Sequence, residues 1–286
     1  PTDGGNGEGE GDVAEIVEVT FVTGGAGGPM HTIGGAICNV WNENLDNVNA
    51  TNSSTAASVV NCNMVSEGKA EVGFTMSDVA YLGHRGEIMF EEPIEGMVGL
   101  TSLHTNYVQL ITKKNSGINS VYDLKGKRVG VGAPGSGTEF NANCIIEAAG
   151  MSYDDLAKAD YLSYAETTEQ LGNDNIDAGF LTGGLPIAAI SEIATTHDID
   201  IIPIDSEIIE ELNKMYPIYF EDDIYGDLYK DIPDPVQTAA LKNYIVINKD
   251  VDEDLVYDLL KTMHENWEQI QLSHSGMKEV TPEMAV

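Results

Sequence analysis

Positively charged residues are scarce in this chain. Its 286 residues contain 14 Lys and Arg against 47 Asp and Glu, which gives a formal net charge of -33. Because proteins bind nucleic acid through cations that neutralise phosphates, this composition excludes a binder with a broad basic face. It also disfavours adsorption to an anionic membrane, which needs clustered Lys and Arg. Two interpretations of the acidity remain open: a protein kept soluble at high salt, or an ordinary acidic extracellular protein.

Cysteines and long apolar runs are also rare. The three cysteines, Cys38, Cys62 and Cys144, form no CxxC pair and have no histidine at zinc spacing. We therefore expect buried free thiols and neither a disulfide framework nor a structural zinc site. No apolar run reaches the roughly 18 residues that a membrane-spanning helix needs.

The six histidines form no HExxH motif and no other close pair. Neither a metal site nor a catalytic triad therefore has a visible base, and we predict no metal, no cofactor and no catalysis. We expect the histidines to lie at the surface or to form local hydrogen bonds. His31 is the exception, because it follows a glycine-rich loop and is a candidate to face a ligand.

The composition is otherwise that of a globular protein. Hydrophobic residues make up 42% of the chain, and the length allows one large or two medium domains. Residues 1–12, PTDGGNGEGEGD, are rich in Gly and acidic residues and are predicted to be a disordered tether. Such a tether suits a secreted or membrane-anchored protein whose leader has been removed, although a cloning choice would look the same.

Short β-rich runs alternate with helical patterns after this tether. Residues 16–22 alternate like a strand, and Ile33, Ile37 and Val40 fall on one face of a helix. Further strands are expected at 70–76, 98–103, 107–113, 128–132, 178–182, 199–204 and 243–248. Further helices are expected at 56–64, 139–149, 167–171, 185–195, 207–215 and 252–271. This alternation predicts parallel sheets flanked by helices, an α/β fold.

Small and hydroxyl residues gather at the expected strand-to-helix junctions. These junctions are TGGAGGP at 23–29, TNSSTAAS at 51–58, TMSD at 75–78, GAPGSGTEF at 132–140 and TGGLP at 182–186. Each offers unpaired backbone N–H groups and the partial positive charge of a helix N-terminus, which favour a carboxylate or phosphate. Together they predict a small anionic or polar ligand held largely by backbone and hydroxyl donors.

Each junction also has a purely structural interpretation. Ser136 followed by Glu139 is a capping box, and Gly150 suits the end of the same helix, so helix stability alone would explain that stretch. Thr55 and Ser77 would serve equally well as N-caps. The number of such junctions favours a ligand more than any one of them does.

A dinucleotide-binding enzyme is the alternative from another class. Gly130-x-Gly132-x-x-Gly135 matches GxGxxG between a strand and a helix. Pro134 and a further Gly-Ser-Gly step lengthen this loop, however, and no strand ends in an acidic residue about twenty positions later. The dinucleotide interpretation is therefore the weaker one.

Several sequence blocks together resemble a known receptor family. The blocks are TGGAGGPMHTIGG at 23–35, SEGKAEVGFTMSDVAY at 66–81, SVYDLKGKRVGVGAPGSGTE at 120–139, and the later YDDL, IDAGF and LPIAAI. They resemble the TAXI family, the extracytoplasmic substrate-binding receptors of tripartite ATP-independent periplasmic (TRAP) transporters. The resemblance spans about residues 13 to 284, and the block LKGKRVGVGAPGSGTE carries most of its specificity.

The resemblance implies a two-lobed periplasmic-binding-protein fold of the second type, which closes on a ligand in the cleft between its lobes. It implies a first lobe at 13–105 and 205–286, a second lobe at 106–204, and hinges near 105–107 and 204–205. A long C-terminal helix would brace the first lobe.

The implied function is that of a monomeric receptor outside the cytoplasm, in the periplasm or on the outer face of the membrane, with a lipid anchor as an option. It would capture glutamate, glutamine or a dicarboxylate such as 2-oxoglutarate and deliver it to TRAP membrane subunits without catalysis. A lobe that reports ligand to a signalling partner uses the same cleft and remains the alternative.

The resemblance also implies the ligand wall, residue by residue. The wall comprises Thr23, Gly24, Gly27, Gly28, Thr55, Ser58, Asn61, Ser77, Gly135, Ser136, Gly137, Thr138, Gly184 and Pro186. Asp78, beside Ser77, is expected to be a helix cap or an acceptor for a ligand amine.

The chain departs from the family pattern where specificity is expected. Ala56 and Ala57 replace two glycines, and Met30 and His31 replace a pair of tyrosines, which leaves room for a ligand of different size or charge. Arg85 is a candidate to clamp a second carboxylate, with solvent exposure as the alternative.

The net charge bears on this function as well. A receptor for organic anions on a strongly acidic body would repel its ligand at low salt, so local donors must do the attracting. At 1 M salt the Debye length falls to about 3 Å and screens the repulsion. We therefore predict a halophilic origin.

Overall fold

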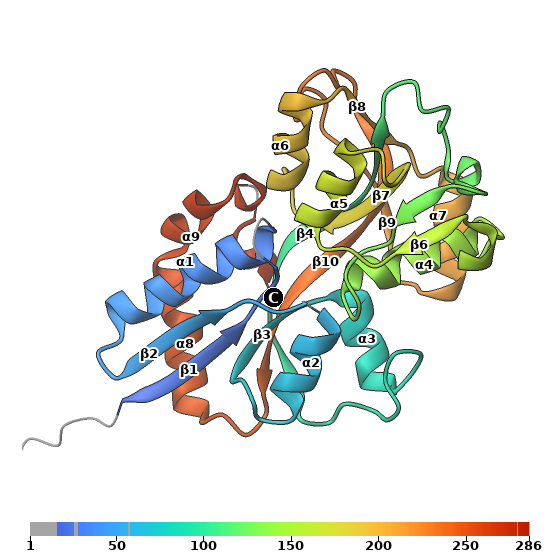
Figure 1. Ribbon diagram of the computed structural model, residues 1–286. Coiled ribbons are helices and arrows are strands. Elements are labelled where there is room, and N and C mark those ends of the chain that lie inside the picture. The colour runs from blue at the N-terminus through green and yellow to red at the C-terminus, as the bar shows by residue number, and fades with distance from the viewer. Residues whose placement is uncertain (1–15, 26–27, 57, 279, 286) are drawn as a thin grey trace, which may run out of the picture.

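Two long strands, β4 (Met97–Lys113) and β10 (Val236–Asn248), pair antiparallel in the middle of one ten-stranded sheet. The computed structural model describes residues 16–25, 28–56, 58–278 and 280–285. The predicted tether at 1–12 lies outside these residues. The strand order is β2-β1-β3-β10-β4-β7-β5-β6, with β8 paired to β4 and β9 paired to β10. Figure 1 shows two groups of elements, one at each end of β4 and β10.

The first group is built on three parallel strands beside β10. These strands are β1 (Val17–Val22), β2 (Val48–Ser53) and β3 (Val72–Met76), and their helices are α1 (Pro29–Asn44), α2 (Ser58–Ser66), α3 (Ser77–Arg85), α8 (Glu253–Glu265) and α9 (Trp267–Ser273). Two short 3-10 helices follow at Ser275–Met277 and Pro282–Ala285. Ile33, Ile37 and Val40 turn the apolar face of α1 into the core, as the sequence predicted. The Trp41 Nε1–H donates to the Leu259 carbonyl at 3.0 Å and ties α1 to α8.

The second group lies on the other side of Figure 1. It contains the strands β5 (Arg128–Gly130), β6 (Lys158–Asp160), β7 (Ala178–Gly183), β8 (Ile199–Ile202) and β9 (Phe220–Ile224), the helices α4 (Gly137–Ala148), α5 (Tyr164–Gly172), α6 (Ala188–Thr196) and α7 (Ser206–Met215), and 3-10 helices at Val121–Leu124 and Tyr153–Asp155. α7 packs against α4, and β9 pairs with the first half of β10. Both elements therefore lie with the second group.

The α/β fold predicted from the sequence is confirmed, but the sheet is parallel only in part. β1 to β3 are parallel, and so are β5, β6 and β7, whereas β4 and β10 run antiparallel to their neighbours. The prediction of wholly parallel sheets is therefore wrong for the two central strands. The cause is that β4 and β10 carry the chain between the two groups and so run against the parallel strands on either side.

Several element boundaries also differ from the prediction. The strands expected at 98–103 and 107–113 are one continuous strand, because the polar residues His104 and Asn106 are buried within it. The helix expected at 252–271 is interrupted at Asn266, which separates α8 from α9. β2 and β9 were not expected as strands, since their sequences VNATNS and FEDDI are mostly polar or acidic.

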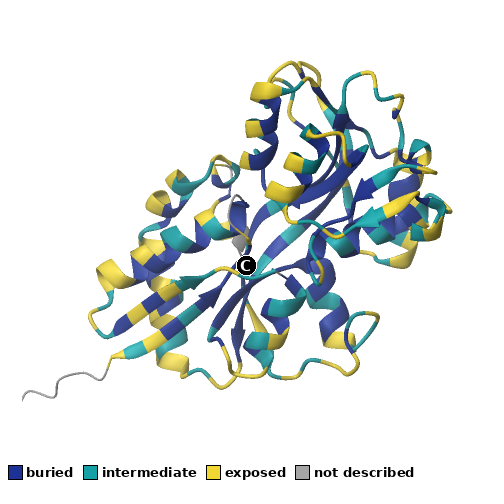
Figure 2. Ribbon diagram, in the orientation of Figure 1, coloured by how far each residue is buried: buried dark blue, intermediate teal, exposed yellow. Residues whose placement is uncertain are grey.

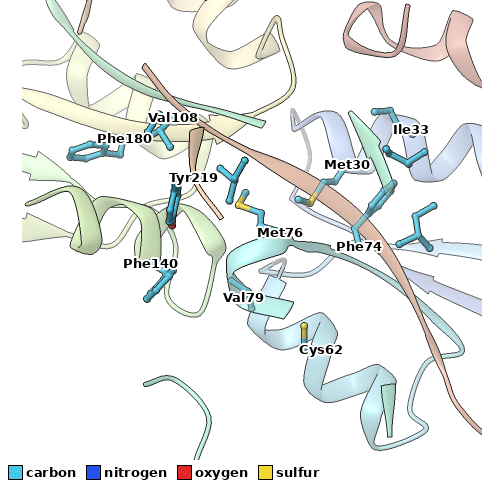
Figure 3. Packing of buried hydrophobic residues seen from close by; sticks show 14 of the residues in the cluster. Met30, Ile33, Cys62, Phe74, Met76, Val79, Val108, Phe140, Phe180 and Tyr219 are labelled. Carbon is cyan, nitrogen blue, oxygen red and sulfur yellow. The ribbon is translucent and has the colours of Figure 1, made fainter. Parts of the chain in front are cut away.

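Buried apolar residues line the contact between sheet and helices in both groups (Figure 2). The main core cluster includes Phe21 and Phe74 in the first group and Phe140 and Phe180 in the second, and Figure 3 shows part of it. All three cysteines are free and buried, as predicted. Burial raises the pKa of the Cys38 and Cys62 thiols to about 12, which makes them inert. Within the described residues, we find no helix that is both long enough and apolar enough to cross a membrane.

Candidate ligand-binding cleft

A cavity of about 440 Å³ lies where the helix N-termini of the two groups face each other. From the first group it is lined by Gly24, Gly25, Gly28, Pro29, Met30, Thr55, Ala56 and Met76. From the second group it is lined by Ala133, Ser136, Gly137, Thr138, Ser163, Tyr164, Ala165, Thr182 and Gly183. The size is that of a small-molecule site. We call this cavity the cleft.

The wall from the first group is fixed by buried polar side chains behind it. The Thr23 hydroxyl donates to Asn52 Oδ1 at 2.8 Å, and the Asn61 amide donates to the carbonyls of Thr23 and Phe74, at 2.7 Å each. Thr55 lines the cleft and bonds the Thr23 carbonyl at 2.8 Å. Thr23 and Asn61 thus hold the loops in place, and Thr55 is the member of this network that reaches the cleft.

The wall from the second group is built at the starts of α4 and α5. The Tyr164 hydroxyl donates to the Thr182 carbonyl, and Thr138 Oγ1 lies 3.2 Å from the Tyr164 hydroxyl oxygen. Ser136 caps α4, because its Oγ accepts the Glu139 N–H at 3.2 Å. This is the capping role that the sequence indicated, and Ser136 also lines the cleft. Desolvation raises the pKa of Tyr164, which keeps its phenol neutral.

The two walls meet closely at glycines. A Cβ on Gly137 would lie 2.5 Å from Met76 Sδ, and one on Gly28 would lie 3.2 Å from Tyr164 Cε2. Gly137 and Tyr164 belong to the second group, whereas Met76 and Gly28 belong to the first. A side chain at either position would push these neighbours back, so the two glycines keep the walls close together.

The residues implied by the family resemblance fall into three sets. Gly24, Gly28, Thr55, Ser136, Gly137 and Thr138 line the cleft. A second set, Thr23, Ser58 and Asn61, lies behind it, where Ser58 Oγ accepts the Met76 N–H at 3.2 Å. Gly27 lies outside the described residues.

The third set lies around the cleft without lining it. Ser77 is buried with no hydrogen-bond partner for its Oγ among the described residues, and Gly135 precedes Ser136 at a φ of 71°. Gly184 packs on His104, and the Pro186 carbonyl lies 3.2 Å from His274 Nε2. His31 is half-buried, with Nδ1 3.4 Å from Thr23 Oγ1.

Arg85 is directed to solvent rather than to the cleft. Its guanidinium pairs with Glu87, with the Nε bonded to Oε1 at 2.8 Å, and its side chain is 49% exposed. It also lies over the Tyr81 ring at 5.4 Å from the ring centroid. This arrangement matches the solvent-exposed alternative, and we leave Arg85 out of the cleft.

Some lining residues were missed by the sequence reasoning. Ser163, Tyr164 and Ala165 start α5, and their signal was the capping box from Ser163 to Glu166. It was overlooked because the preceding strand, β6, has only 3 residues. Thr182 was recognised as part of a junction but was not named as a site residue.

A buried carboxylate joins the two groups beside the cleft. Asp78, in α3, accepts hydrogen bonds from the Tyr219 hydroxyl at 2.6 Å, from the Val79 N–H at 2.8 Å and from the Asn141 amide of α4. Its burial raises the pKa of the carboxyl group to about 6, and the hydrogen bonds partly offset this. Asp78 is not among the lining residues, and its oxygens are already bonded within the protein.

Solved structures of binding proteins share this architecture. The periplasmic aliphatic sulphonate binding protein SsuA from Escherichia coli has a TM-score of 0.54 at 13% identity, with 93% of this chain and 78% of that chain covered. PhnD1 from Prochlorococcus marinus, in complex with methylphosphonate, has a TM-score of 0.60 at 9% identity, covering 91% and 90%. A histidine-bound substrate binding protein of an ABC uptake transporter from Streptococcus pneumoniae has a TM-score of 0.55 at 14% identity, covering 90% and 92%.

These similarities show the fold. The chain has the α/β fold of periplasmic binding proteins, with a mixed sheet and flanking helices. A sequence-family model assigns the chain to a family as well as to a fold. The model matches residues 21–286, from the end of β1 to the last residue. That match covers both groups of elements and every wall of the cleft, so the chain belongs to the NMT1-like family.

Proposed function

We propose that this protein is an extracytoplasmic solute receptor that captures a small organic anion and delivers it to the membrane subunits of a transporter. The observation that carries the proposal is the cleft, which is lined from both groups by hydroxyls and helix N-termini. Such a site binds by hydrogen bonds and helix dipoles, and the described lining holds no His, Cys, Lys, Asp or Glu that could activate one of its hydroxyls as a nucleophile. We therefore propose binding and not catalysis.

We further propose that the two groups are lobes that close on the ligand. The family resemblance implies a second lobe at 106–204, and the positions of α7 and β9 favour extending it through residue 224. The first lobe would then comprise 13–105 and the segment after the first half of β10. The strands β4 and β10 are the connections between the lobes. Closure about a few residues is the usual motion of such proteins.

For the membrane partner we propose TRAP subunits, on the strength of the TAXI-like blocks at 23–35 and 120–139. An ABC permease is the second candidate, because the histidine-bound structure of the same fold comes from an ABC uptake transporter. Neighbouring genes separate the two. Fused TRAP membrane subunits support the first, an ATP-binding subunit supports the second, and a histidine kinase would support ligand sensing.

Ligand capture is tested by a thermal-shift screen of small solutes, followed by small-angle scattering. A true ligand at a hundredfold excess over its Kd stabilises the folded state by about 2.7 kcal/mol, and closure lowers the radius of gyration. Ala165 is exposed and lines the cleft, so Ala165→Trp should fill the cleft and abolish both responses. Ala157 is exposed outside the cleft, and Ala157→Trp is the matched control. A flat response across acids, amides, amino acids and sugars would refute the receptor function.

A further inference from the structure

We infer that the ligand is an organic monoanion with an apolar body, carrying no ammonium group and no second carboxylate. The inference rests on the proposed receptor function and narrows its ligand. It differs from the glutamate, glutamine and dicarboxylate ligands that the family resemblance implies. Three features of the described lining support it: buried hydroxyls able to donate to a ligand, the lack of a carboxylate, and an apolar wall without Lys or Arg.

The first feature is the set of open donors. Thr182 lines the cleft and is 1% exposed, yet its Oγ1 has no hydrogen-bond partner among the described residues. Ser136 Oγ receives the Glu139 N–H, which leaves the hydroxyl proton of Ser136 for a ligand oxygen. A buried hydroxyl without a partner is costly, and a ligand oxygen would satisfy it.

Hydrogen bonds link the starts of α4 and α5 to the end of β7. Thr138 Oγ1 is 3.2 Å from the Tyr164 hydroxyl, which in turn donates to the Thr182 carbonyl. The start of α4 is therefore beside Thr182, across the edge of β7. This is where we place the anionic head of the ligand.

The second feature is the lack of a negatively charged acceptor in the described lining, where several carbonyls already accept a hydrogen bond within the protein. Backbone carbonyls of lining residues accept bonds from within the protein: Gly24 from Ser54, Gly25 from Gly28, Ala133 from Ser136, Ser163 from Thr167, and Thr182 from Tyr164. The described lining residues include no Asp or Glu, and the gaps in these loops, residues 26, 27 and 57, are Ala, Gly and Ala. An ammonium group would be desolvated here without a counter-charge, which is strongly unfavourable.

The third feature is the wall that faces the donors. It consists of Pro29, Met30, Ala56 and Met76, with no Lys or Arg among the described lining residues. Figure 3 shows the Met30 and Met76 side chains near the contact between the two groups. Methionine side chains adapt to apolar ligand surfaces, whereas a second carboxylate on this wall would remain unpaired. The net charge of -33 adds a repulsion that grows with the charge of the ligand.

The test compares ligands of matched size by titration calorimetry. Pentanoate and pentanesulfonate are the monoanions, and together they distinguish a carboxylate head from a sulfonate head. Norvaline adds an ammonium group to the same skeleton, glutarate adds a second carboxylate, and pentanamide removes the charge. We expect at least one monoanion to bind at least tenfold more tightly than norvaline, glutarate and pentanamide.

A pair of isosteric variants tests the head-group position. Thr182→Val should weaken binding of the preferred monoanion about tenfold or more, the loss expected for one hydrogen bond to a charged group. Thr167→Val is the matched control, because Thr167 Oγ1 is also buried and without a partner among the described residues but lies outside the lining. Equal effects of the two variants would overturn the placement of the anion at Thr182.

The outcomes also separate this inference from the receptor function. If norvaline, glutarate or pentanamide binds as tightly as the monoanions, the inference is wrong and the receptor function stands. If none of these compounds binds but an amino acid, a dicarboxylate, an amide or a sugar from the screen does, the inference is again wrong and the receptor function stands. If no solute of any class binds, both are wrong.

Discussion

At the scale of single residues, Asp78 carries a fully enclosed carboxylate whose hydrogen-bond partners are all uncharged: Val79, Asn141 and Tyr219. Burial raises its pKa from 3.8 to about 6. Between these values the folded protein binds more protons at this site than the unfolded chain does. The contribution of Asp78 to stability is therefore greatest below about pH 4 and is lost as the pH rises through 6.

We predict that Asp78→Asn removes this pH dependence. The free energy of unfolding of the wild type, minus that of the variant, should fall by roughly 3 kcal/mol between pH 4 and 7, at about 1.4 kcal/mol per pKa unit. Urea denaturation at a series of pH values measures the difference. Tyr219→Phe keeps the carboxylate but removes a hydrogen-bond donor that favours its charged form. The pKa of Asp78 should therefore rise, and its contribution to stability should persist to a higher pH. A wild-type minus Asp78→Asn difference that does not vary with pH would contradict the burial of a titrating group.

The site was only partly predictable at this scale. Ser136, Gly137 and Thr138 could be predicted from the sequence, because a glycine- and hydroxyl-rich loop before a helix is a local signal of a helix start. The Asp78 cluster had no local signature, because Asn141 and Tyr219 lie 63 and 141 positions away in the chain. Arg85 was proposed as a clamp for a second carboxylate, but its guanidinium pairs with Glu87, which lies only two positions away.

At the scale of elements, the connection after β7 packs tightly on β4. A Cβ on Gly184 would lie 2.5 Å from His104 Cδ2, and His104 is 1% exposed. The expectation that His104 lies at the surface is wrong, because the residue is buried and its Nε2 lies 3.3 Å from Asn243 Nδ2 in β10. Burial lowers the pKa of His104 to about 3, so the ring is neutral.

We predict that Gly184→Ala destabilises the protein by roughly 1 to 3 kcal/mol, the usual cost of overpacking, because the buried ring has little room to move. Gly99→Ala is the control within β4, where a Cβ would meet nothing within 4 Å. Urea denaturation of both variants gives the comparison. If Gly184→Ala and Gly99→Ala were equally stable, the prediction would be wrong, because His104 would then have moved aside to make room for the methyl group.

The helices and strands were predicted well where apolar residues recur with a clear period, and poorly where the buried residues are polar. α1 follows its apolar stripe, and β3 follows its buried sequence VGFTM. The centre of β4 contains His104 and Asn106, which look like a break in the sequence but are buried in the sheet. Tertiary burial of polar residues overrides strand propensity, and the sequence carries no local signal for it.

At the scale of the whole molecule, self-repulsion dominates the electrostatics. A charge of -33 on 286 residues opposes the compact state, and salt screens it. We predict that raising KCl from about 0.1 to about 1 M, where the Debye length falls from roughly 10 to 3 Å, increases the melting temperature by several degrees and tightens binding of an anionic ligand. Sucrose at equal osmolality is the control, because it stabilises without screening charge. A melting temperature that responds equally to both solutes would argue against repulsion.

The pairing of β4 with β10 along most of their length has a consequence for motion. Their register runs from Ala240 opposite Tyr107 to Asn248 opposite Met97, with shifts on either side of Asn243 and near Ile245. A molecule that bends across a hydrogen-bonded sheet must twist these strands without parting them. Amide hydrogens at the proposed hinge should therefore exchange with deuterium as slowly as those of the core, with and without ligand. The pivot of the closing motion would be among the most protected segments of the chain, whereas the loops of the cleft would gain protection only when ligand is bound.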